Sequence, residues 1–173
     1  MLYGRGKTGS HGRGFTLIEL LVVMTIIAIA FFALRLSFIG VLRGAESRGA
    51  FRKIAGLLTS ARAESIARGK LVRVMCAPAE GVLWVEMQVD PAVDLYEFQP
   101  LSVLGRPEVR LPGHLRLDDV FVGGRDFRAE GDTAIYFYPD GRTDGARLVV
   151  VSERGEETVV DVAPTTGRVT ISA

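Results

Sequence analysis

The sequence predicts an α+β protein in which one long N-terminal helix precedes an antiparallel β-sheet or sandwich domain. Three regions carry this prediction. An almost unbroken apolar run covers residues 15–34, apolar residues recur at helical intervals over 43–69, and residues 70–173 hold short alternating segments between Gly- and Pro-rich turns. A single helix followed by a series of strands is typical of the α+β class.

The apolar run has the length of a membrane span but contains a glutamate. The stretch Leu20–Leu34 carries no charged residue and corresponds to roughly 22 Å of helix. Extension back to Phe15 gives about 30 Å, the thickness of the hydrocarbon core, but includes Glu19. A carboxylate in hydrocarbon is costly, so we expect Glu19 to have a function that requires its charge.

The residues on either side of the run indicate an anchor rather than a cleaved secretory signal. Arg5, Lys7 and Arg13 precede it, so the positive-inside rule predicts a cytoplasmic N-terminus with the remainder of the chain across the membrane. The residues that follow, RLSFIGVLRGAESRGAF, contain no convincing small-residue site for a signal peptidase.

The charge of the chain is unevenly distributed. Residues 1–70 hold eleven Lys and Arg against three Asp and Glu, a net charge of +8, whereas residues 71–173 hold ten against 17, a net charge of −7. Binding of nucleic acid needs clustered basic residues that contact phosphates. The acidic C-terminal part therefore argues against a nucleic-acid partner.

Residues 43–69 predict an amphipathic continuation of the helix. Charged residues separate most of the apolar positions, which are Phe51, Ile54, Leu57, Leu58, Ala61 and Ile66. We expect this apolar face to pack on the protein's own globular domain. Gly69, followed by Lys70, is the expected end of the helix.

Seven or so short strands are predicted in residues 70–173. The segments LVRVMCA and VLWVEMQV, joined by PAEG, predict a hairpin, and short strands are expected around Leu101–Leu104 and Leu115–Val122 in the loop-rich residues 90–132. The segment TAIYFYPDGRTDGARLVVVS predicts two strands around a Gly/Asp loop. The segment TVVDVAPTTGRVTIS predicts two more around a Pro-Thr-Thr-Gly turn.

No group of residues in the sequence indicates catalysis. The single cysteine, Cys76, excludes an internal disulfide and lies in an alternating run, where a buried core residue is expected. A nucleophilic cysteine needs a nearby histidine, and the two histidines, His11 and His114, lie before the apolar run and in a loop-like segment. The glycine pairs do not open a helix after a strand, so no nucleotide site or cofactor is expected.

The acidic residues are expected to be structural. Asp140 and Asp144 in PDGRTDG lack the alternating acids and the distant glutamate of an EF-type calcium loop, so a turn without a metal is predicted. The adjacent pairs Asp118–Asp119 and Glu156–Glu157 are expected on the solvated surface.

The segment RGFTLIELLVVMTIIAIA resembles the N-terminus of type IV pilins and type II secretion pseudopilins. In that family a membrane aspartyl peptidase cuts after a glycine on the cytoplasmic side and methylates the new N-terminal residue. The resemblance implies that residues 1–14 are a prepilin leader peptide and that the cut falls between Gly14 and Phe15. Phe15 would be N-methylated, and residues 15–42 would form a transmembrane and assembly helix.

The resemblance also implies a reason for the glutamate. Cleavage exposes a cationic amine on Phe15. In a filament whose core is a bundle of these helices, Glu19 of one subunit would neutralise the amine of a neighbour and so set the axial stagger. The chain departs from many relatives at Leu36, where they carry a proline, and Arg35 is expected to reach the outer membrane interface.

The C-terminal part resembles the H-type minor pseudopilins, the GspH/FimT-like family. The segments that carry this likeness are ARAESIARGKLVRV, FYPDGRTDG and TTGRV. It implies a minor pseudopilin, a structural subunit of the type II secretion pseudopilus that drives export of folded proteins across the outer membrane. It also implies an anchor in the inner membrane and a periplasmic globular domain over residues 70–173. The implied partners are the prepilin peptidase, other major and minor pseudopilins, the inner membrane and secreted substrates.

Two other functions compete with this one. A FimT-like minor type IV pilin would act in pilus assembly or DNA uptake, but DNA-contacting members use a basic patch near the C-terminus, where the last hairpin of this chain offers only Arg168. A membrane-tethered enzyme that uses Glu86 or Asp140 is disfavoured because the ionisable residues do not converge on a known mechanism. The expected protein is not an enzyme.

Overall fold

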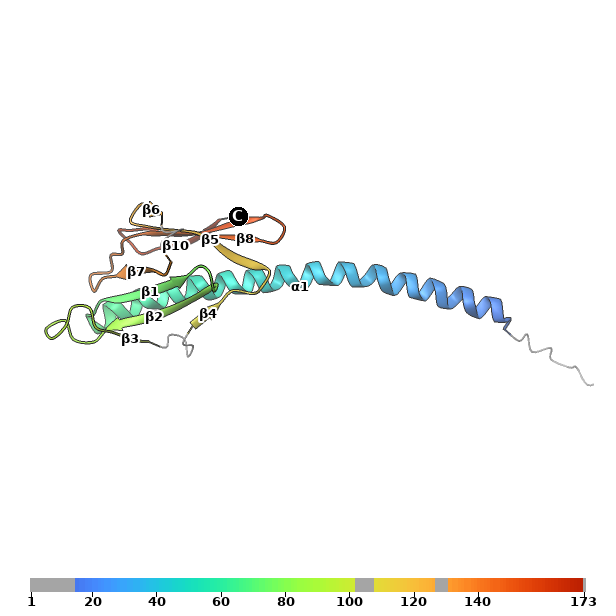
Figure 1. The fold of residues 1–173 in the computed structure, drawn as a ribbon, viewed down its shortest axis with the longest axis horizontal. Helices are drawn as coiled ribbons and strands as arrows, with labels where there is room; N and C mark the ends of the chain where they lie inside the picture. Colours follow the sequence, from blue (N-terminus) through green and yellow to red (C-terminus); the bar gives the residue numbers. More distant parts are fainter. Residues whose placement is uncertain (1–14, 102–107, 127–130, 173) are drawn as a thin grey trace, which may run out of the picture. The chain divides into compact units, whose positions relative to one another are not determined.

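The computed structural model describes residues 15–101, 108–126 and 131–172, with the side chains of residues 33–42 excepted (Figure 1). The leader residues 1–14, and with them Gly14, lie outside the described residues. The chain divides into two compact units, one that ends at Leu42 and one that begins at Arg43.

The long helix expected at the N-terminus is present. Helix α1 covers Leu17–Arg68, 52 residues in all, with Glu19 in its first turn and Arg68 in its last. Both charges suit the helix dipole. Gly69 follows the helix with φ of 63°, a left-handed conformation that glycine adopts without strain, which confirms the predicted end.

The large apolar side chains of the first unit are exposed. Between Leu17 and Phe32 their exposed fractions range from 45% for Val23 to 82% for Leu17. Within the described residues, no helix holds a stretch that is both long and apolar enough to cross a membrane. The transmembrane assignment of residues 15–42 therefore stays a prediction.

The second unit contains two antiparallel sheets. The first has the order β3-β2-β1-β7, with β4 also paired to β2, and the second has the order β10-β9-β8-β5-β6. The strands of the first sheet are β1 (Val72–Ala77), β2 (Val82–Gln88), β3 (Phe98–Pro100), β4 (Glu108–Arg110) and β7 (Thr133–Phe137). Those of the second are β5 (Leu115–Val122), β6 (Arg125–Asp126), β8 (Ala146–Ser152), β9 (Glu157–Val162) and β10 (Val169–Ser172).

The pairing confirms most of the predicted strands. Strands β1 and β2 form the expected hairpin, β9 and β10 pair around the Pro-Thr-Thr-Gly turn, and β5 has the predicted bounds. The additional strands in the described part of the chain are short, with two or three residues each: β3, β4 and β6. The strand expected around Leu101–Leu104 is not seen at Leu101, which follows β3, and residues 102–104 lie outside the described part.

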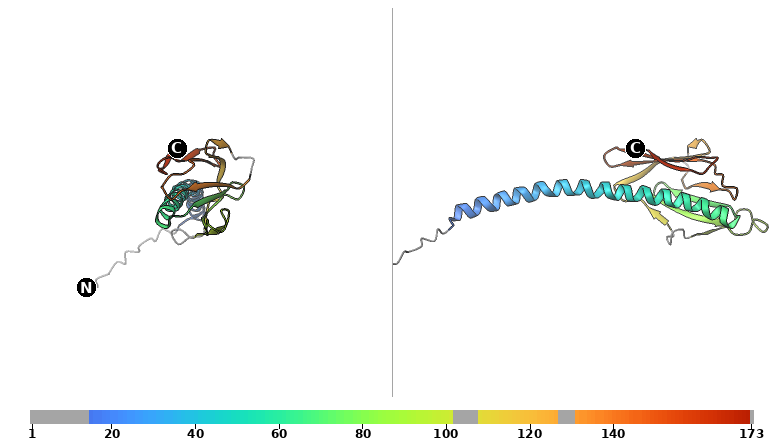
Figure 2. Two further views of the ribbon diagram at one scale, coloured as in Figure 1. Left: turned by 90° about the vertical axis from the view of Figure 1, so that its left-hand side faces the viewer. Right: turned by 180° about the vertical axis from the view of Figure 1, so that it is seen from behind.

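The Gly/Asp loop between β7 and β8 connects the two sheets. Strand β7 pairs with β1, whereas β8 pairs with β5 and β9. The loop is therefore a crossover rather than the turn of a local hairpin. Along its described strands the chain therefore passes from the first sheet to the second twice, after β4 and again after β7. Figure 2 shows the fold from two further sides.

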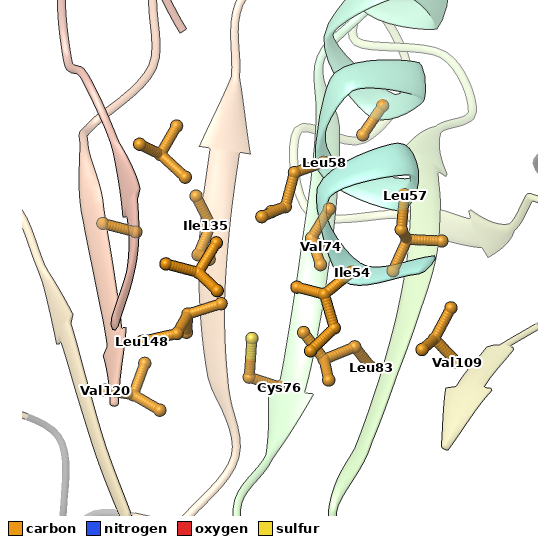
Figure 3. Close-up of a cluster of buried hydrophobic side chains, with 14 of the residues drawn as sticks. Ile54, Leu57, Leu58, Val74, Cys76, Leu83, Val109, Val120, Ile135 and Leu148 are labelled. Atoms are coloured by element: carbon orange, nitrogen blue, oxygen red, sulfur yellow. The ribbon is translucent and has the colours of Figure 1, made fainter. Parts of the chain in front are cut away.

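One hydrophobic core joins residues 43–68 of α1 to both sheets. Ile54, Leu57, Leu58 and Ala61 are each at most 1% exposed, which confirms the predicted buried face of the helix. They lie against core side chains of the sheets, among them Val74, Cys76, Leu83, Ile135 and Leu148 (Figure 3). The expected core position of Cys76 is confirmed.

The prediction is wrong for one helical position. Ile66 is 46% exposed, and the inward position in that turn belongs to Ser65, which is fully buried. Ser65 follows Ala61 by four residues and so continues the buried stripe, whereas Ile66 is turned away from it by about 100°.

The expectation that Asp119 is solvated is also wrong. Its side chain is 9% exposed. The reason is an irregularity in β5, where the register to β8 shifts between Leu117 and Asp119. Such a β-bulge interrupts the alternation of inward and outward residues, so that Asp119 and Val120 are both buried.

Candidate functional site

The start of α1 forms a hydrogen-bonded cap around Thr16. The Thr16 Oγ1 accepts a hydrogen bond from the backbone N–H of Glu19 at 3.3 Å, and the Thr16 carbonyl accepts one from the N–H of Leu20 at 3.2 Å. Thr-x-x-Glu is the sequence signature of a capping box. The sequence prediction treated Glu19 as an assembly residue and did not note the cap at Thr16, although the Thr16–Glu19 spacing indicates it.

The cap fixes Glu19 at the N-terminal end of the helix while its side chain stays exposed. The partial positive charge of the helix N-terminus favours a carboxylate at this place. Phe15, directly before the cap, is 78% exposed. The structure therefore places Phe15, the predicted methylation site, and Glu19, the predicted assembly residue, at the same end of α1, and both are exposed.

The exposed apolar surface continues around the helix. Its members in the described residues are Leu17, Ile18, Leu20, Leu21, Val22, Val23, Met24, Ile26, Ile27, Ile29, Phe31 and Phe32. These side chains point in all directions around the helix axis because they occupy twelve of the sixteen positions from Leu17 to Phe32. Exposed apolar surface of this extent marks a contact with another protein or with lipid.

The three segments that carry the C-terminal resemblance meet at Arg62. The Arg62 Nε donates a hydrogen bond to the carbonyl of Gly141 at 3.0 Å. A Cβ added to Gly141 would lie 3.0 Å from Arg62 Nη2, and one added to Gly167 would lie 2.8 Å from Arg62 Nε. The guanidinium and its stem thus fill the space that these two glycines leave open.

Further bonds tie the same loops to the helix and to each other. Ser65 Oγ donates to the carbonyl of Arg62 at 2.8 Å and lies 3.2 Å from that of Tyr138, and the backbone N–H of Thr143 donates to the carbonyl of Pro164 at 3.0 Å. The conspicuous sequence motifs are therefore a structural joint between α1, the crossover loop and the last turn. Sequence reasoning did not find Arg62, because its partners lie 79 and 105 residues further along the chain.

A second joint holds the first turns of the helix in this unit. Arg43 Nη1 donates to Glu153 Oε2 at 2.8 Å, and Ser47 Oγ lies 2.9 Å from His114 Nε2. Glu46 Oε2 is 3.7 Å from the other ring nitrogen of His114. A serine, a histidine and a carboxylate in this order resemble a catalytic triad.

The direction of the hydrogen bonds argues against catalysis at this joint. The Ser47 hydroxyl donates to the carbonyl of Arg43 at 2.9 Å, so its oxygen accepts from His114 Nε2. A serine nucleophile requires the opposite arrangement, in which the histidine accepts the hydroxyl proton. The group therefore fixes the helix to the segment before β5.

The remaining candidate residues have structural surroundings. Burial raises the pKa of the Cys76 thiol to about 12, so the thiolate that a nucleophile needs is not formed near neutral pH. Asp140 accepts hydrogen bonds from the backbone N–H of Arg142 at 3.0 Å and from its Nε at 2.7 Å, and these bonds lower the pKa of Asp140. Asp144 accepts a bond from the Tyr138 hydroxyl at 3.0 Å. The predicted turn at PDGRTDG is confirmed.

Glu86 is likewise engaged within the first sheet. Its carboxylate lies 2.7 Å from the guanidinium of Arg73 and accepts a bond from Trp84 Nε1 at 2.9 Å. Although burial opposes its charge, the hydrogen bonds to Glu86 and Tyr136 raise the pKa of Arg73. Among the described residues, no group of three or more His, Cys, Asp or Glu could hold a metal ion.

A helix with an exposed apolar start, and an antiparallel β-sheet domain packed on its residues 43–68, define a pilin-like protein. Comparison with known families agrees with this class. The prokaryotic N-terminal methylation motif matches residues 10–34, and the type II transport protein GspH matches residues 50–167. Because the second match spans more than half of the chain, the chain belongs to the GspH family of type II transport proteins.

A solved structure has the same fold. The chain is similar to the minor pseudopilin EpsH from the type 2 secretion system of Vibrio cholerae, with a TM-score of 0.57 and 14% identity. The similarity covers 74% of this chain and 97% of that chain. None of the curated proteins matches the sequence.

The family assignment confirms both resemblances seen in the sequence. The protein is a minor pseudopilin of the type II secretion system, a structural subunit rather than a member of an enzyme family. This outcome favours secretion over the alternative of a type IV pilin that takes up DNA. The methylation motif implies processing by a prepilin peptidase, and the family implies other pseudopilins as partners.

Proposed function

We propose that the chain is made as a precursor, which the prepilin peptidase cleaves between Gly14 and Phe15 and then methylates on the Phe15 nitrogen. Residues 15–42 would hold the subunit in the inner membrane as a single span, with the N-terminus in the cytoplasm and residues 43–173 in the periplasm. The basic residues Arg5, Lys7 and Arg13 before the apolar run support this orientation.

The assembled subunit would join other pseudopilins in the filament that drives folded proteins across the outer membrane. In this proposal Glu19 pairs with the Phe15 amine of a neighbour. The observation that supports the pairing is that the exposed Glu19 side chain lies at the same end of the helix as Phe15 and among exposed apolar side chains.

The energetics favour one stagger between neighbouring helices. When apolar helices pack together, water leaves the region around Glu19, and an unpaired carboxylate or amine there becomes costly. A neighbour in the correct stagger supplies the opposite charge and removes that cost. A neighbour displaced by a turn buries both charges without a partner, so the pair selects the register rather than merely adding affinity.

Mass spectrometry of the membrane form tests the processing step. We expect the mature chain to lack residues 1–14 and to carry one added methyl group on Phe15. Detection of a chain that begins only at Met1, in cells with an active prepilin peptidase, would contradict the proposal. A Gly14→Leu variant serves as the uncleaved standard.

The variant Glu19→Ala tests the pairing. We expect cleavage to continue while incorporation into filaments falls about tenfold or more, a loss of at least about 1.4 kcal/mol per contact. Incorporation is measured as the fraction of the chain in sheared filaments, relative to that in membranes. Normal incorporation of Glu19→Ala would refute the pairing.

Two control variants separate the charge from the cap. Thr16→Val removes the capping oxygen but retains the carboxylate, so we expect a small loss of helix stability, about 1 kcal/mol, and filaments that still form. Glu64→Ala removes another glutamate of α1, which pairs with Arg68 on the surface, and should leave incorporation within about twofold of the parent.

A further inference from the structure

The loop between β2 and β3, residues 89–97, presents the most exposed large apolar side chains among the described residues of the second unit. Val93, Leu95 and Tyr96 are 80%, 61% and 86% exposed. The next values in this unit are 46% for Ile66 and 45% for Ile171. Neither the core nor the joints described above explain why three such side chains lie together in water.

The loop is held in a defined conformation by its own polar groups. Asp90 Oδ1 accepts a bond from the N–H of Ala92 at 2.9 Å, and Asp94 Oδ1 accepts one from the N–H of Tyr96 at 2.7 Å. The side-chain amide of Gln88 donates to the carbonyl of Leu95 at 2.9 Å. An ordered loop loses little conformational entropy on binding, which favours a contact surface.

The base of the loop is also fixed. Phe98, the first residue of β3, lies under the Arg73 guanidinium, whose Cζ is 3.9 Å from the ring centroid. Its ring meets that of Tyr136 edge-on, with the centroids 6.4 Å apart. Lys70 Nζ donates to the carbonyl of Val89 at the other side of the base.

The loop is acidic, and this property restricts its partner. It contains Asp90, Asp94 and Glu97, and no lysine or arginine lies between Arg73 and Arg106. An anionic lipid surface would repel three carboxylates. The complementary surface is a protein surface with an apolar depression between basic side chains.

The second unit carries a mostly basic, exposed stretch on α1. Arg48, Arg52 and Lys53 are exposed, and Gly49 lies between them on the helix. A Cβ built on Gly49 would meet no atom within 4 Å, so the helix surface is uncovered at this glycine, and we call this position the Gly49 notch. Glycine within a helix costs up to about 1 kcal/mol relative to alanine, a cost that close approach of another chain would offset.

The acidic loop and the basic notch lie at opposite ends of the domain. The loop adjoins the end of α1, since the N–H of Gln88 donates to the carbonyl of Leu71 at 2.9 Å, as Figure 1 also shows. The notch is about 20 residues earlier on the same helix, roughly 30 Å away. Two complementary surfaces at opposite ends join molecules head to tail and do not close into a ring unless the rotation allows it.

We propose that the loop of residues 89–97 docks on the Gly49 notch of a second copy of this chain. Tyr96 or Leu95 enters the notch, while Asp94 and Glu97 face Arg48, Arg52 and Lys53 of the partner. The inference deepens the proposed function, on which it rests, because it supplies an axial contact between globular domains in addition to the Glu19 pair.

Cysteine cross-linking of the full chain in membranes tests the contact. One tagged copy carries Tyr96→Cys and a second, differently tagged copy carries Ala45→Cys, which lies one turn before Gly49. We expect a mixed dimer with a short thiol cross-linker, at least about tenfold above the pair Tyr96→Cys and Glu157→Cys, whose second site lies on the second sheet. The native Cys76 is fully buried and does not compete.

A charge exchange tests the specificity. Glu97→Lys and Arg52→Glu should each reduce the yield of the cross-linked mixed dimer about fivefold or more. When one copy carries Glu97→Lys and the other carries Arg52→Glu, the yield should return to that of the parent pair. Equal yields at Ala45 and Glu157, or no rescue, would overturn the proposal. Loss of filament incorporation in Tyr96→Asp without any mixed dimer would mean that a different subunit covers the loop, which would also overturn it.

The two proposals fail independently. Absence of cleavage at Gly14 would refute the processing step whatever the cross-link yield. If the cross-link is absent while Glu19→Ala still impairs assembly, the helix pairing stands and the loop contact is wrong.

Discussion

The two parts of α1 use similar apolar side chains in opposite ways. Before residue 33, Leu17, Ile26 and Phe31 are 82%, 61% and 71% exposed. After residue 43, Ile54, Leu57 and Leu58 are at most 1% exposed. The difference lies in the pattern and not in the residue type, because the first part is apolar on every side while the second has one apolar face.

This difference shows where each part finds its partner. A single apolar face can be covered by the protein's own sheets, which is what the core of the second unit does. A helix that is apolar all round cannot be covered by one domain on one side, and it requires lipid or a bundle of other helices. The same helix thus supplies part of the core over one stretch and leaves its apolar side chains exposed over the other.

The largest expected contrast is between Leu58→Ala and Ile26→Ala. Leu58 is fully buried, so its truncation leaves a cavity and should lower the free energy of unfolding of the second unit by about 2–5 kcal/mol. Ile26→Ala should leave that unfolding within about 0.5 kcal/mol of the parent. Denaturant unfolding of the full chain in detergent, followed by Trp84 fluorescence, measures both. A comparable loss in the two variants would contradict the separation of roles.

A smaller effect is expected at the joint around Arg62. Gly167→Ala adds a Cβ at a left-handed position, φ 59°, and directly against Arg62, so we expect a loss of about 2 kcal/mol in the free energy of unfolding. Gly123→Ala is the matched control, because it has φ of 57° and nothing within 4 Å of the added Cβ. It should lose about 1 kcal/mol, the backbone strain alone.

The double variant sharpens the test of this joint. Arg62→Ala removes the clashing side chain, so Gly167→Ala should cost about 1 kcal/mol less in that background than in the parent. Equal costs in the two backgrounds would show that the Arg62 side chain moves away from the added Cβ without loss of stability. The segments around Arg62 and Gly167 would then not depend on each other.

The sequence predicted the features that depend on neighbouring residues. The end of α1 at Gly69, the bounds of β5 and the hairpin of β1 and β2 follow from glycine, alternation and turn residues that lie within a few positions. Ile66 and Asp119 were predicted on the wrong face. In the helix the buried position is Ser65 instead of its neighbour Ile66, and in β5 the bulge turns Asp119 inward. Each is a displacement by one residue, which changes the face of a side chain but hardly changes the apolar pattern of the sequence.

Features that join distant segments could not be predicted in this way. The crossover at residues 138–145 depends on which sheet offers a free edge, and Arg62 depends on two loops that come together only after folding. The proposed processing at Phe15 and the proposed assembly role of Glu19 are a different case, because both come from a motif and not from packing. The cap at Thr16 could have been predicted from the sequence, since a threonine three residues before a glutamate is itself a capping signal.

The last expected effect concerns the core around Cys76, and it appears only at alkaline pH. Burial raises the thiol pKa from 9.0 to about 12, so above pH 9 the unfolded chain loses this proton while the folded chain retains it. The free energy of unfolding should therefore fall with rising pH by about 1.4 kcal/mol per unit between these pKa values, relative to a Cys76→Ala variant. Denaturant titrations of both chains at pH 8 and pH 10 measure this difference. The contributions of other titrating groups, such as Tyr138, are the same in the two chains and cancel. A thiol that reacts with maleimide in the folded chain at pH 8, or parallel pH profiles for the two chains, would contradict the burial on which this prediction rests.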